Sequence, residues 1–289
     1  MNDQSLNDFL GDLKEENFSI NRQEIREISE FILGISYVDL LIGSPKISTK
    51  EKELFINLVK RRSKGEPLAY LIEKKGFWNL DLFVNSSVLV PRPETETIIE
   101  DVLDSFGHGH QRVLDLGTGT GAIALSLKSE RPKWEIFASD ISKKAIEVAI
   151  KNTKLNKLDV RFFQGNWLNA INYEAIDLLI SNPPYIQEAD PCLQADGILF
   201  EPKSALVSKN KGLDDLFMII DAALFNLKEG GSIYLEHSPS QYNEVKKRLE
   251  KNHFRKIKSL RDLNGDRRIT KAVKSVSYTH LTLPTNREV

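Results

Sequence analysis

The chain has 289 residues, of which 40% are hydrophobic and 28% charged, a composition typical of globular proteins with a packed core. Its 40 Lys and Arg residues are balanced by 41 Asp and Glu residues, so it lacks the basic excess that marks a stable partner of nucleic acid. A single cysteine, Cys192, excludes an internal disulfide and a multi-thiolate zinc site. The N-terminus matches neither a secretory signal nor a membrane span, so we expect a cytoplasmic protein without a metal.

Residues 1–75 are predicted to form an N-terminal helical domain, the first of two domains that the length predicts at about 150 residues per domain. Apolar residues recur in this segment at helical spacing. Ser48 followed by Glu51 is typical of a capping box, and it opens a helix that is expected to end near Gly65.

Residues 76–93 are predicted to be a β-hairpin linker. Apolar and polar residues alternate there on both sides of Asn85-Ser86-Ser87, which favours two short strands joined by a turn. Pro91-Arg92-Pro93 closes the segment, because proline neither continues a strand nor fits inside a helix.

Residues 94–275 alternate short apolar strands with amphipathic helices, which predicts an α/β domain with a mostly parallel twisted sheet and helices on both faces. Towards the end of this domain, a long helix is expected to stop at Gly230-Gly231, and Asn264-Gly265 is expected to turn a hairpin. Residues 276–289 have no periodic partner and are predicted to be a non-native or disordered tail.

The first motif that carries chemistry is the glycine loop, which comprises Gly117, Thr118, Gly119, Thr120 and Gly121 and lies between a predicted strand and a predicted helix. Glycines at such a junction let the backbone approach a ligand closely. The spacing also fits the dinucleotide pattern G-x-G-x-x-A, so it is compatible with nicotinamide as well as with S-adenosylmethionine.

Asp140 ends the next predicted strand, at the position from which a carboxylate accepts hydrogen bonds from ribose hydroxyls. This placement favours a nucleoside ligand. The alternative is that Asp140 merely caps the helix that follows it.

The second motif is Asn182-Pro183-Pro184-Tyr185, directly after an apolar strand and therefore at the carboxyl edge of the sheet, where open α/β folds bind ligands. An amide nitrogen is a poor nucleophile, because its lone pair is delocalised into the carbonyl. The side-chain oxygen of Asn182 and the backbone carbonyl of Pro183 offer two acceptors that together would hold one NH₂ group near an electrophilic methyl. The prolines would stiffen the loop, and Tyr185 would stack on the planar group.

Together, the glycine loop, Asp140 and Asn182-Pro183-Pro184-Tyr185 resemble class I (Rossmann-like) S-adenosylmethionine-dependent methyltransferases that act on amino or amide nitrogens. Further segments resemble a narrower group, the release-factor glutamine N5-methyltransferases or HemK-like family, over about residues 1–273. These segments are Gly65-Glu66-Pro67-Leu68-Ala69-Tyr70, Pro91-Arg92-Pro93-Glu94-Thr95-Glu96, Glu201-Pro202 with Ala205-Leu206, Gly212-Leu213, and Leu235-Glu236-His237.

The resemblance implies transfer of a methyl group from S-adenosyl-L-methionine to the N5 amide nitrogen of the glutamine in the Gly-Gly-Gln motif of class I peptide chain release factors. It assigns the substrate glutamine to Asn182, Pro183, Pro184 and Tyr185, with Asn182, Pro183 and Tyr185 as catalytic residues and Asn182 also beside the cofactor. The helical domain would then help to dock the release factor.

By the same resemblance, the glycine loop would wrap the methionine part of the cofactor, Asp140 would bind its ribose and Trp167 would flank its adenine. Two positions depart from the family pattern. Asn166 stands where the family often has an acid, and Ser238 stands where it usually has glycine.

Several alternatives stay open from the sequence. The same four-residue motif would suit a nucleic-acid adenine N6-methyltransferase or a ribosomal-protein glutamine methyltransferase, and the fold alone would suit a nucleoside-binding protein without activity. Arg92 would either pair with an acid or approach the cofactor carboxylate. His237 is expected to have a structural role. Cys192 is expected to be an ordinary side chain of the loop after the motif, without an activating base.

Overall fold

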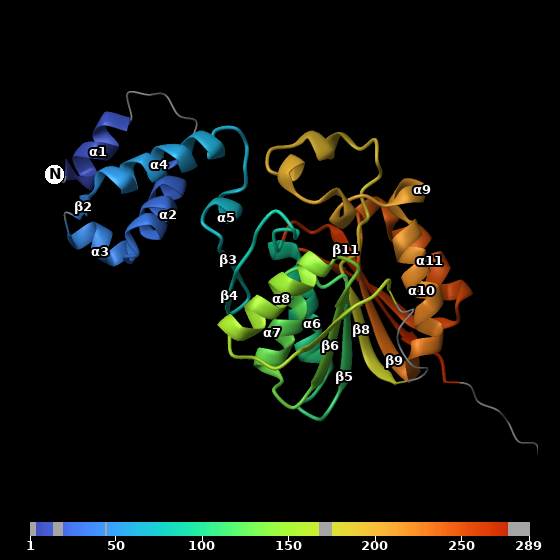
Figure 1. Ribbon diagram of the computed structural model, residues 1–289. Coiled ribbons are helices and arrows are strands. Elements are labelled where there is room, and N and C mark those ends of the chain that lie inside the picture. The colour runs from blue at the N-terminus through green and yellow to red at the C-terminus, as the bar shows by residue number, and fades with distance from the viewer. Residues whose placement is uncertain (1–3, 14–19, 44, 168–174, 277–289) are drawn as a thin grey trace, which may run out of the picture.

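The structure is a computed structural model that describes residues 4–13, 20–43, 45–167 and 175–276. The N-terminal part is a bundle of short helices with a two-stranded ribbon (Figure 1). Its core is formed by apolar side chains that include Ile28, Ile47, Phe55 and Leu58. The elements are β1 (Gln4–Ser5), α1 (Leu6–Leu13), α2 (Arg22–Leu33), α3 (Tyr37–Ile42), β2 (Lys46–Ile47), α4 (Thr49–Arg62) and α5 (Leu68–Leu71).

The predicted capping box is present at the start of α4. The side chain of Ser48 accepts a hydrogen bond from the backbone N–H of Glu51, and the carboxylate of Glu51 accepts one from the backbone N–H of Ser48 at 2.7 Å. These bonds satisfy donors that a helix N-terminus otherwise leaves unpaired. The helix ends at Arg62, close to the expected end near Gly65.

The linker hairpin lies earlier in the chain than predicted. Its strands are β3 (Lys75–Phe77) and β4 (Leu80–Leu82), so the chain turns at Trp78 and Asn79 rather than at residues 85–87. Trp78 has a φ of 53°, a left-handed conformation that is uncommon for residues other than glycine, which is why the turn carried no sequence signal. Residues 85–87 form a separate turn in which the side chain of Asn85 accepts from the N–H of Ser87 at 2.9 Å.

The C-terminal domain is built on a seven-stranded sheet in the order β10-β11-β9-β8-β5-β6-β7. Strands β5 to β9 run parallel, and β11 is antiparallel to both of its neighbours, so the predicted mostly parallel α/β sheet is confirmed. The strands are β5 (Arg112–Leu116), β6 (Glu135–Asp140), β7 (Arg161–Gln164), β8 (Ile176–Ser181), β9 (Leu227–Glu236), β10 (Phe254–Arg261) and β11 (Arg267–Lys274).

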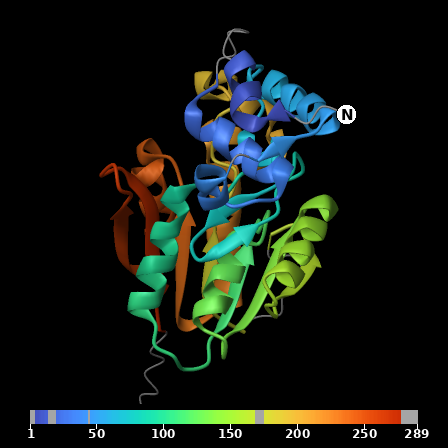
Figure 2. The same ribbon diagram turned by 90° about the vertical axis from the view of Figure 1, so that its left-hand side faces the viewer.

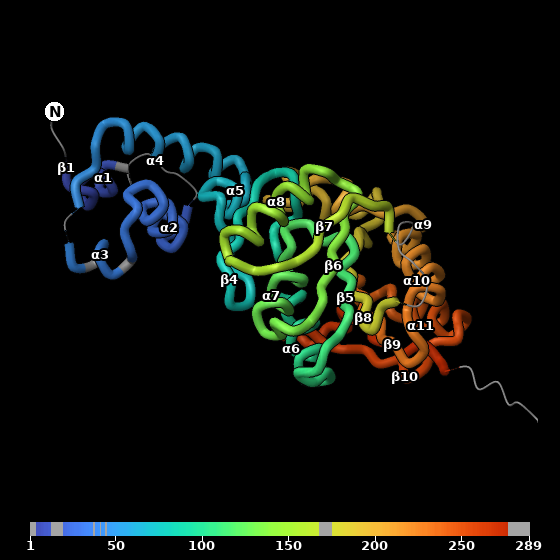
Figure 3. The backbone as a smooth tube through the Cα atoms, turned by 60° about the horizontal axis from the view of Figure 1, so that its bottom comes forward, coloured from blue at the N-terminus to red at the C-terminus, as the bar shows by residue number. Residues whose placement is uncertain are grey.

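Helices cover both faces of this sheet (Figures 1 and 3). One face carries α6 (Glu96–Ser105), α7 (Ala122–Glu130) and α8 (Lys143–Leu155), and the other carries α10 (Asp214–Asn226) and α11 (Tyr242–Lys251). Successive residues of a strand point to opposite faces, so in β5 Val113 packs with the first core while Leu114 and Leu116 pack with the second. Shorter helices lie in the connections: η2 (Pro93–Thr95), η3 (Pro191–Gln194), η4 (Ile198–Phe200), η5 (Lys203–Ala205), α9 (Lys209–Gly212) and η6 (Pro239–Gln241).

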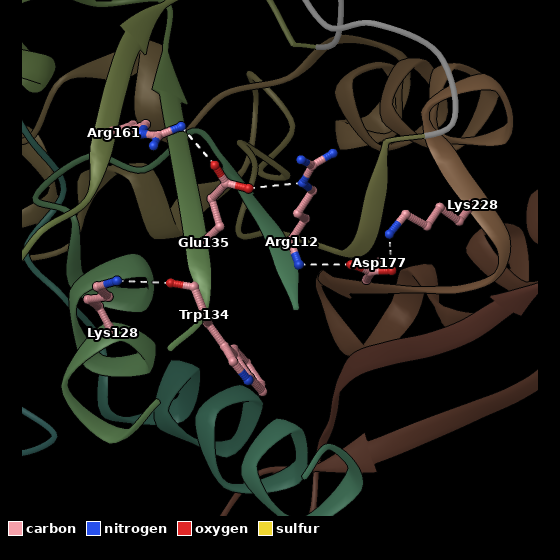
Figure 4. A network of polar contacts seen from close by, with 7 residues as sticks. All are labelled: Arg112, Lys128, Trp134, Glu135, Arg161, Asp177 and Lys228. Carbon is pink, nitrogen blue, oxygen red and sulfur yellow. Dashed lines mark hydrogen bonds and ion pairs between the residues drawn. The ribbon is translucent and has the colours of Figure 1, made fainter. Parts of the chain in front are cut away.

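The amino ends of the central strands are tied together by ion pairs (Figure 4). Glu135 at the start of β6 pairs with Arg112 of β5 at 2.9 Å and with Arg161 of β7 at 2.8 Å. Asp177 of β8 accepts from the backbone N–H of Arg112 at 2.8 Å and pairs with Lys228 of β9 at 2.6 Å. Charged side chains at the amino ends of these strands therefore pair with one another across neighbouring strands.

Two further expectations concern the end of the domain. The predicted turn at Asn264-Gly265 joins β10 to β11 as expected. The long helix α10 ends at Asn226 rather than at Gly230-Gly231, because residues 228–231 form an irregularity within β9, where the pairing with β8 jumps from Ile176–Leu227 to Leu178–Ser232. The two glycines therefore mark a bulge in a strand, a position in which glycine is common.

The helical domain lies beyond one end of the sheet (Figure 2). The turn from α6 to β5 lies at the other end. Contact with the C-terminal domain runs through the connection after α4. A Cβ added to Gly65 would lie 3.0 Å from Asp196 Oδ1, and one added to Gly197 would lie 3.6 Å from the ring of Pro67. The segment after β8 thus meets the helical domain.

Residues 277–289 make up most of the predicted tail and lie outside the described residues. We expect their removal to leave the melting temperature unchanged. The ladder between β10 and β11 is complete at Phe254 and Lys274, before the deletion begins. Thermal unfolding followed by circular dichroism measures the effect. Deletion of residues 270–289 is the matched control and should destabilise strongly, because buried Thr270 and Ala272 would be lost. A clear drop for the shorter deletion would show that the tail stabilises the fold.

Candidate active site

A cavity of about 350 Å³ opens at the carboxyl ends of β5, β6 and β8. These strands flank the point at which the chain order of the sheet reverses, the usual ligand site of open α/β folds. The lining includes most of the residues that the sequence predicts for the cofactor: Gly117, Thr118, Gly119, Thr120, Asp140, Trp167 and Asn182. Gly121, the last residue of the glycine loop, is the N-cap of α7.

The glycine loop has the backbone conformation that its residues predict. Gly117, Gly119 and Gly121 have φ angles of 71°, 54° and 83°, in the left-handed region that favours glycine. A Cβ added to Gly117 would lie 3.4 Å from the ring of Trp167, so the backbone of Gly117 passes close to that ring. The loop is anchored from below, since the hydroxyl of Thr118 donates to the buried carboxylate of Asp115 at 2.6 Å.

Asp140 supports two backbone segments of the cavity. Its Oδ2 accepts from the N–H of Gly119 at 3.0 Å and its Oδ1 accepts from the N–H of Ser142 at 2.8 Å. The side-chain cap of α8 is Ser142, not Asp140, so the simple capping alternative does not describe the residue. Burial raises the pKa of Asp140, while the backbone N–H groups oppose that rise. A carboxylate oxygen has room for more than one donor, so both oxygens keep capacity for a ligand hydroxyl.

Trp167 lines the cavity and is held by a residue that the sequence did not single out. Its Nε1 donates to Asp215 Oδ1 on α10 at 3.1 Å. The indole therefore has a fixed orientation beside Gly117, with its flat apolar surface available to a planar ring.

Asn182-Pro183-Pro184-Tyr185 follows β8 and separates this cavity from a second one of about 740 Å³. Asn182 lines both cavities, Pro184 lines the first, and Pro183 and Tyr185 line the second. The Nδ2 of Asn182 donates to Thr95 Oγ1 at 3.2 Å. Within the described part of the chain, neither Asn182 Oδ1 nor the carbonyl of Pro183 accepts a hydrogen bond. The two acceptors that the sequence predicts are therefore free at the boundary between two cavities.

The far end of the motif is held by two polar contacts. Tyr185 donates from its hydroxyl to Glu236 Oε1 at 3.2 Å, and its backbone carbonyl accepts from Gln241 Nε2 at 2.9 Å. Glu236 is 1% exposed, and burial raises its pKa to about 7 against the opposing effects of Thr95, Tyr185 and Arg268. Gln241 was missed by the sequence analysis, because only the fold brings it to this loop.

Gly212→Ala is expected to lower the free energy of unfolding by more than about 1 kcal/mol and to disturb the motif. An added Cβ would overlap the carbonyl of Tyr185 and lie 2.6 Å from Gln241 Nε2, and the φ of 81° strains any other residue. Urea unfolding measures the effect. Gly109→Ala is the matched control, since a Cβ there meets nothing within 4 Å. Equal stabilities for the two variants would contradict the close approach.

Arg92 pairs with an acid, which is one of the two roles that the sequence left open for it. Its guanidinium donates to Glu201 Oε2 at 2.6 Å, and the Glu201 side chain is 1% exposed. Burial raises the pKa of Glu201 and the charge of Arg92 opposes that rise. Arg92 lines both cavities, so this ion pair fixes a charged side chain that borders each of them.

His237 and Cys192 have the surroundings of non-catalytic residues. The ring of His237 is fully buried between the carbonyl of Ser238 at 2.8 Å and Thr270 Oγ1 at 2.7 Å, and burial lowers its pKa to about 4. Desolvation and the neighbouring Asp190 raise the pKa of the Cys192 thiol to about 11, so it is not activated as a nucleophile.

The residues that the structure describes also bear on two other functions, metal binding and membrane insertion. No group of three or more His, Cys, Asp and Glu side chains is arranged there to hold a metal ion. Among the helices that the structure describes, none combines the length and apolar character needed to cross a bilayer.

Parts of the chain match known families and a solved structure. Residues 95–219 match the family described as Methyltransferase small domain, and residues 4–72 match the family described as PrmC N-terminal domain. A methyltransferase structure from Pyrococcus furiosus aligns with a TM-score of 0.54 at 19% identity, over 76% of this chain and 99% of that one. This likeness shows the fold.

Curated relatives are similar over most of the chain. A protein of Salmonella typhimurium named release factor glutamine methyltransferase is 38% identical over 251 residues, which is 86% of this chain and 91% of that protein. Proteins of the same name from Xylella fastidiosa and Escherichia coli are 41% and 37% identical, over 79% and 86% of this chain and 84% and 91% of their own lengths.

Proposed function

This chain belongs to the family of release factor glutamine methyltransferases, S-adenosylmethionine-dependent enzymes, and from that membership we propose its substrate and site in detail. It methylates the N5 amide nitrogen of the glutamine in the Gly-Gly-Gln motif of class I peptide chain release factors. The donor is S-adenosyl-L-methionine and the second product is S-adenosylhomocysteine. The proposed reaction takes place in the cytoplasm, without a metal, a stable nucleic-acid partner or a membrane.

The observation that carries this proposal is the position of Asn182 between the two cavities. The first cavity, with the glycine loop, Asp140 and Trp167, would hold the cofactor, and the second would admit the glutamine side chain. Asn182 Oδ1 and the carbonyl of Pro183 would each accept one hydrogen of the substrate NH₂ group. That grip leaves the nitrogen facing the methyl group, and orientation of this kind lowers a barrier by several kcal/mol.

The reaction is a single displacement. The amide nitrogen forms a bond to the methyl carbon as the carbon–sulfur bond breaks, and the electron pair of that bond goes to sulfur. The nitrogen then loses one proton to solvent. A sulfonium is a good leaving group, so no strong base is needed beforehand, in keeping with the neutral, buried His237.

The helical domain is proposed to help dock the release factor. It meets the segment after β8, whose Asp196 and Ile198 line the second cavity. A protein substrate that inserts its glutamine there would therefore pass close to the helical domain.

The test is transfer of labelled methyl from S-adenosylmethionine to a purified, unmethylated release factor. A Gly-Gly-Ala version of the factor, a ribosomal-protein fraction and a DNA duplex are incubated beside it. Label on the wild-type factor alone supports the proposal. Label on the Gly-Gly-Ala version, the ribosomal proteins or the duplex would move the activity to another substrate.

A further inference from the structure

Thr95 and Glu236 form a buried polar chain behind Asn182. Asn182 Nδ2 donates to Thr95 Oγ1 at 3.2 Å, and Thr95 Oγ1 donates to Glu236 Oε2 at 2.7 Å. Thr95 is 4% exposed and Glu236 is 1% exposed. The three residues come from η2, the end of β9 and the loop after β8, so the fold assembles the chain from distant segments.

We propose that Thr95 is a positioning residue whose hydroxyl, held by Glu236, fixes which end of the Asn182 amide faces the substrate. This inference rests on the proposed function, since it concerns how the same NH₂ group is gripped. It adds a residue that does not touch the reacting atoms and acts only through Asn182.

The direction of the hydrogen bonds follows from counting protons. A threonine hydroxyl has one proton, and Thr95 gives it to Glu236 Oε2, which accepts it at 2.7 Å. Oγ1 then offers only lone pairs to Asn182. If the amide were reversed, Asn182 Oδ1 would face Thr95 Oγ1 and two acceptors would meet without a proton between them.

The other oxygen of Glu236 strengthens this assignment. Tyr185 donates its hydroxyl proton to Oε1 at 3.2 Å, so both oxygens of the carboxylate act as acceptors. Glu236 thus accepts one hydrogen bond from Thr95 and one from Tyr185. The amide NH₂ of Asn182 is directed at Thr95, and Oδ1 is left at the boundary of the two cavities.

The consequence is selection of the group that is bound. With Oδ1 facing the second cavity, Asn182 and the Pro183 carbonyl present two acceptors to a ligand with two N–H donors. A reversed Asn182 would present its own NH₂ there, and an incoming NH₂ group would meet a donor instead of an acceptor. Correct orientation of this amide therefore raises the fraction of bound substrate that is placed for attack.

The experiment compares Thr95→Val, which keeps the shape and lacks the hydroxyl, with Thr95→Ser, which keeps the hydroxyl. We expect Thr95→Val to lower kcat by about tenfold, with the Kd for S-adenosylmethionine within about twofold of wild type, because one hydrogen bond to Asn182 is lost. Thr95→Ser should restore most of kcat. Melting temperatures are measured for each protein, and Thr95→Ala is a second hydroxyl-free variant in case Thr95→Val does not fold.

Unchanged kcat in a folded hydroxyl-free variant, or equal losses for Thr95→Val and Thr95→Ser, would overturn the proposal. A loss confined to cofactor binding would also overturn it, because Thr95 lines the first cavity and would then act there.

A double-mutant cycle tests whether Thr95 acts through Asn182. In an Asn182→Ala background, measured in single turnovers with labelled methyl, Thr95→Val should cause no further loss. Additive losses would show an independent role. If the wild-type enzyme does not label the release factor, the proposed function fails; if it does and the Thr95 variants behave like wild type, only the positioning role fails.

Discussion

Asn182→Ala is expected to lower kcat for methyl transfer to the release factor by at least about 100-fold, with the Kd for S-adenosylmethionine within about twofold of wild type. The variant removes one of the two acceptors that would orient the substrate NH₂ group, at the boundary between the two cavities. Misplacement of a reacting group by a small distance costs a large factor in rate. Single-turnover transfer of labelled methyl gives the rate, and calorimetric titration gives the cofactor Kd.

Asn79→Ala is the matched control for this change. Asn79 is an exposed asparagine in the linker hairpin, where its side chain contacts Glu130 at 3.2 Å, away from both cavities. It should keep the wild-type rate. If Asn182→Ala instead abolishes cofactor binding and turnover together, the residue supports the cofactor cavity rather than the substrate.

Much of the fold could be predicted because the central strands are buried on both faces. In β5 the residues from Val113 to Leu116 are all buried and are apolar except for Asp115, and the glycine loop marks where the strand ends. The order of these runs along the chain predicts the parallel sheet, and the sheet predicts the edge at which the site lies.

The linker hairpin and the end of α10 could not be predicted. In both places the local sequence pattern favours a different structure from the one that the chain adopts. The turn at Trp78 uses a left-handed φ without a glycine, and residues 85–87 carry turn residues for a different turn. At Gly230-Gly231 the glycines interrupt a strand, and the helix had already ended at Asn226.

The roles of Thr95 and Glu236, which lie behind Asn182, could not be predicted for a different reason. Thr95 contacts Asn182 across 87 positions of sequence and Glu236 across 141. In the sequence Thr95 and Glu236 are only parts of family-like segments, and the fold alone brings Thr95 to Asn182 and Glu236. Asn182 and Pro183, which are proposed to hold the substrate, could be predicted from the sequence, whereas the contacts of Thr95 and Glu236 behind them could not.

Asp140→Ala is expected to weaken binding of S-adenosylmethionine by about 10- to 100-fold, the loss typical of hydrogen bonds to a charged group. Two effects contribute: the ribose would lose its acceptor, and the N–H of Gly119 would lose the bond that holds the glycine loop. Asp140→Asn keeps one oxygen and should lie between the two. Calorimetric titration with S-adenosylmethionine and with S-adenosylhomocysteine measures both variants.

Asp177→Ala separates cofactor binding from stability. Asp177 lies on β8 at the opposite edge of the same sheet, where it pairs with Lys228 and accepts from Arg112. Its loss should lower the melting temperature and leave the cofactor Kd unchanged, because Asp177 lines neither of the two cavities. Should Asp140→Ala bind the cofactor as tightly as wild type, its carboxylate would serve only the backbone of Gly119 and Ser142, and the ribose would have to be held by another residue of the first cavity.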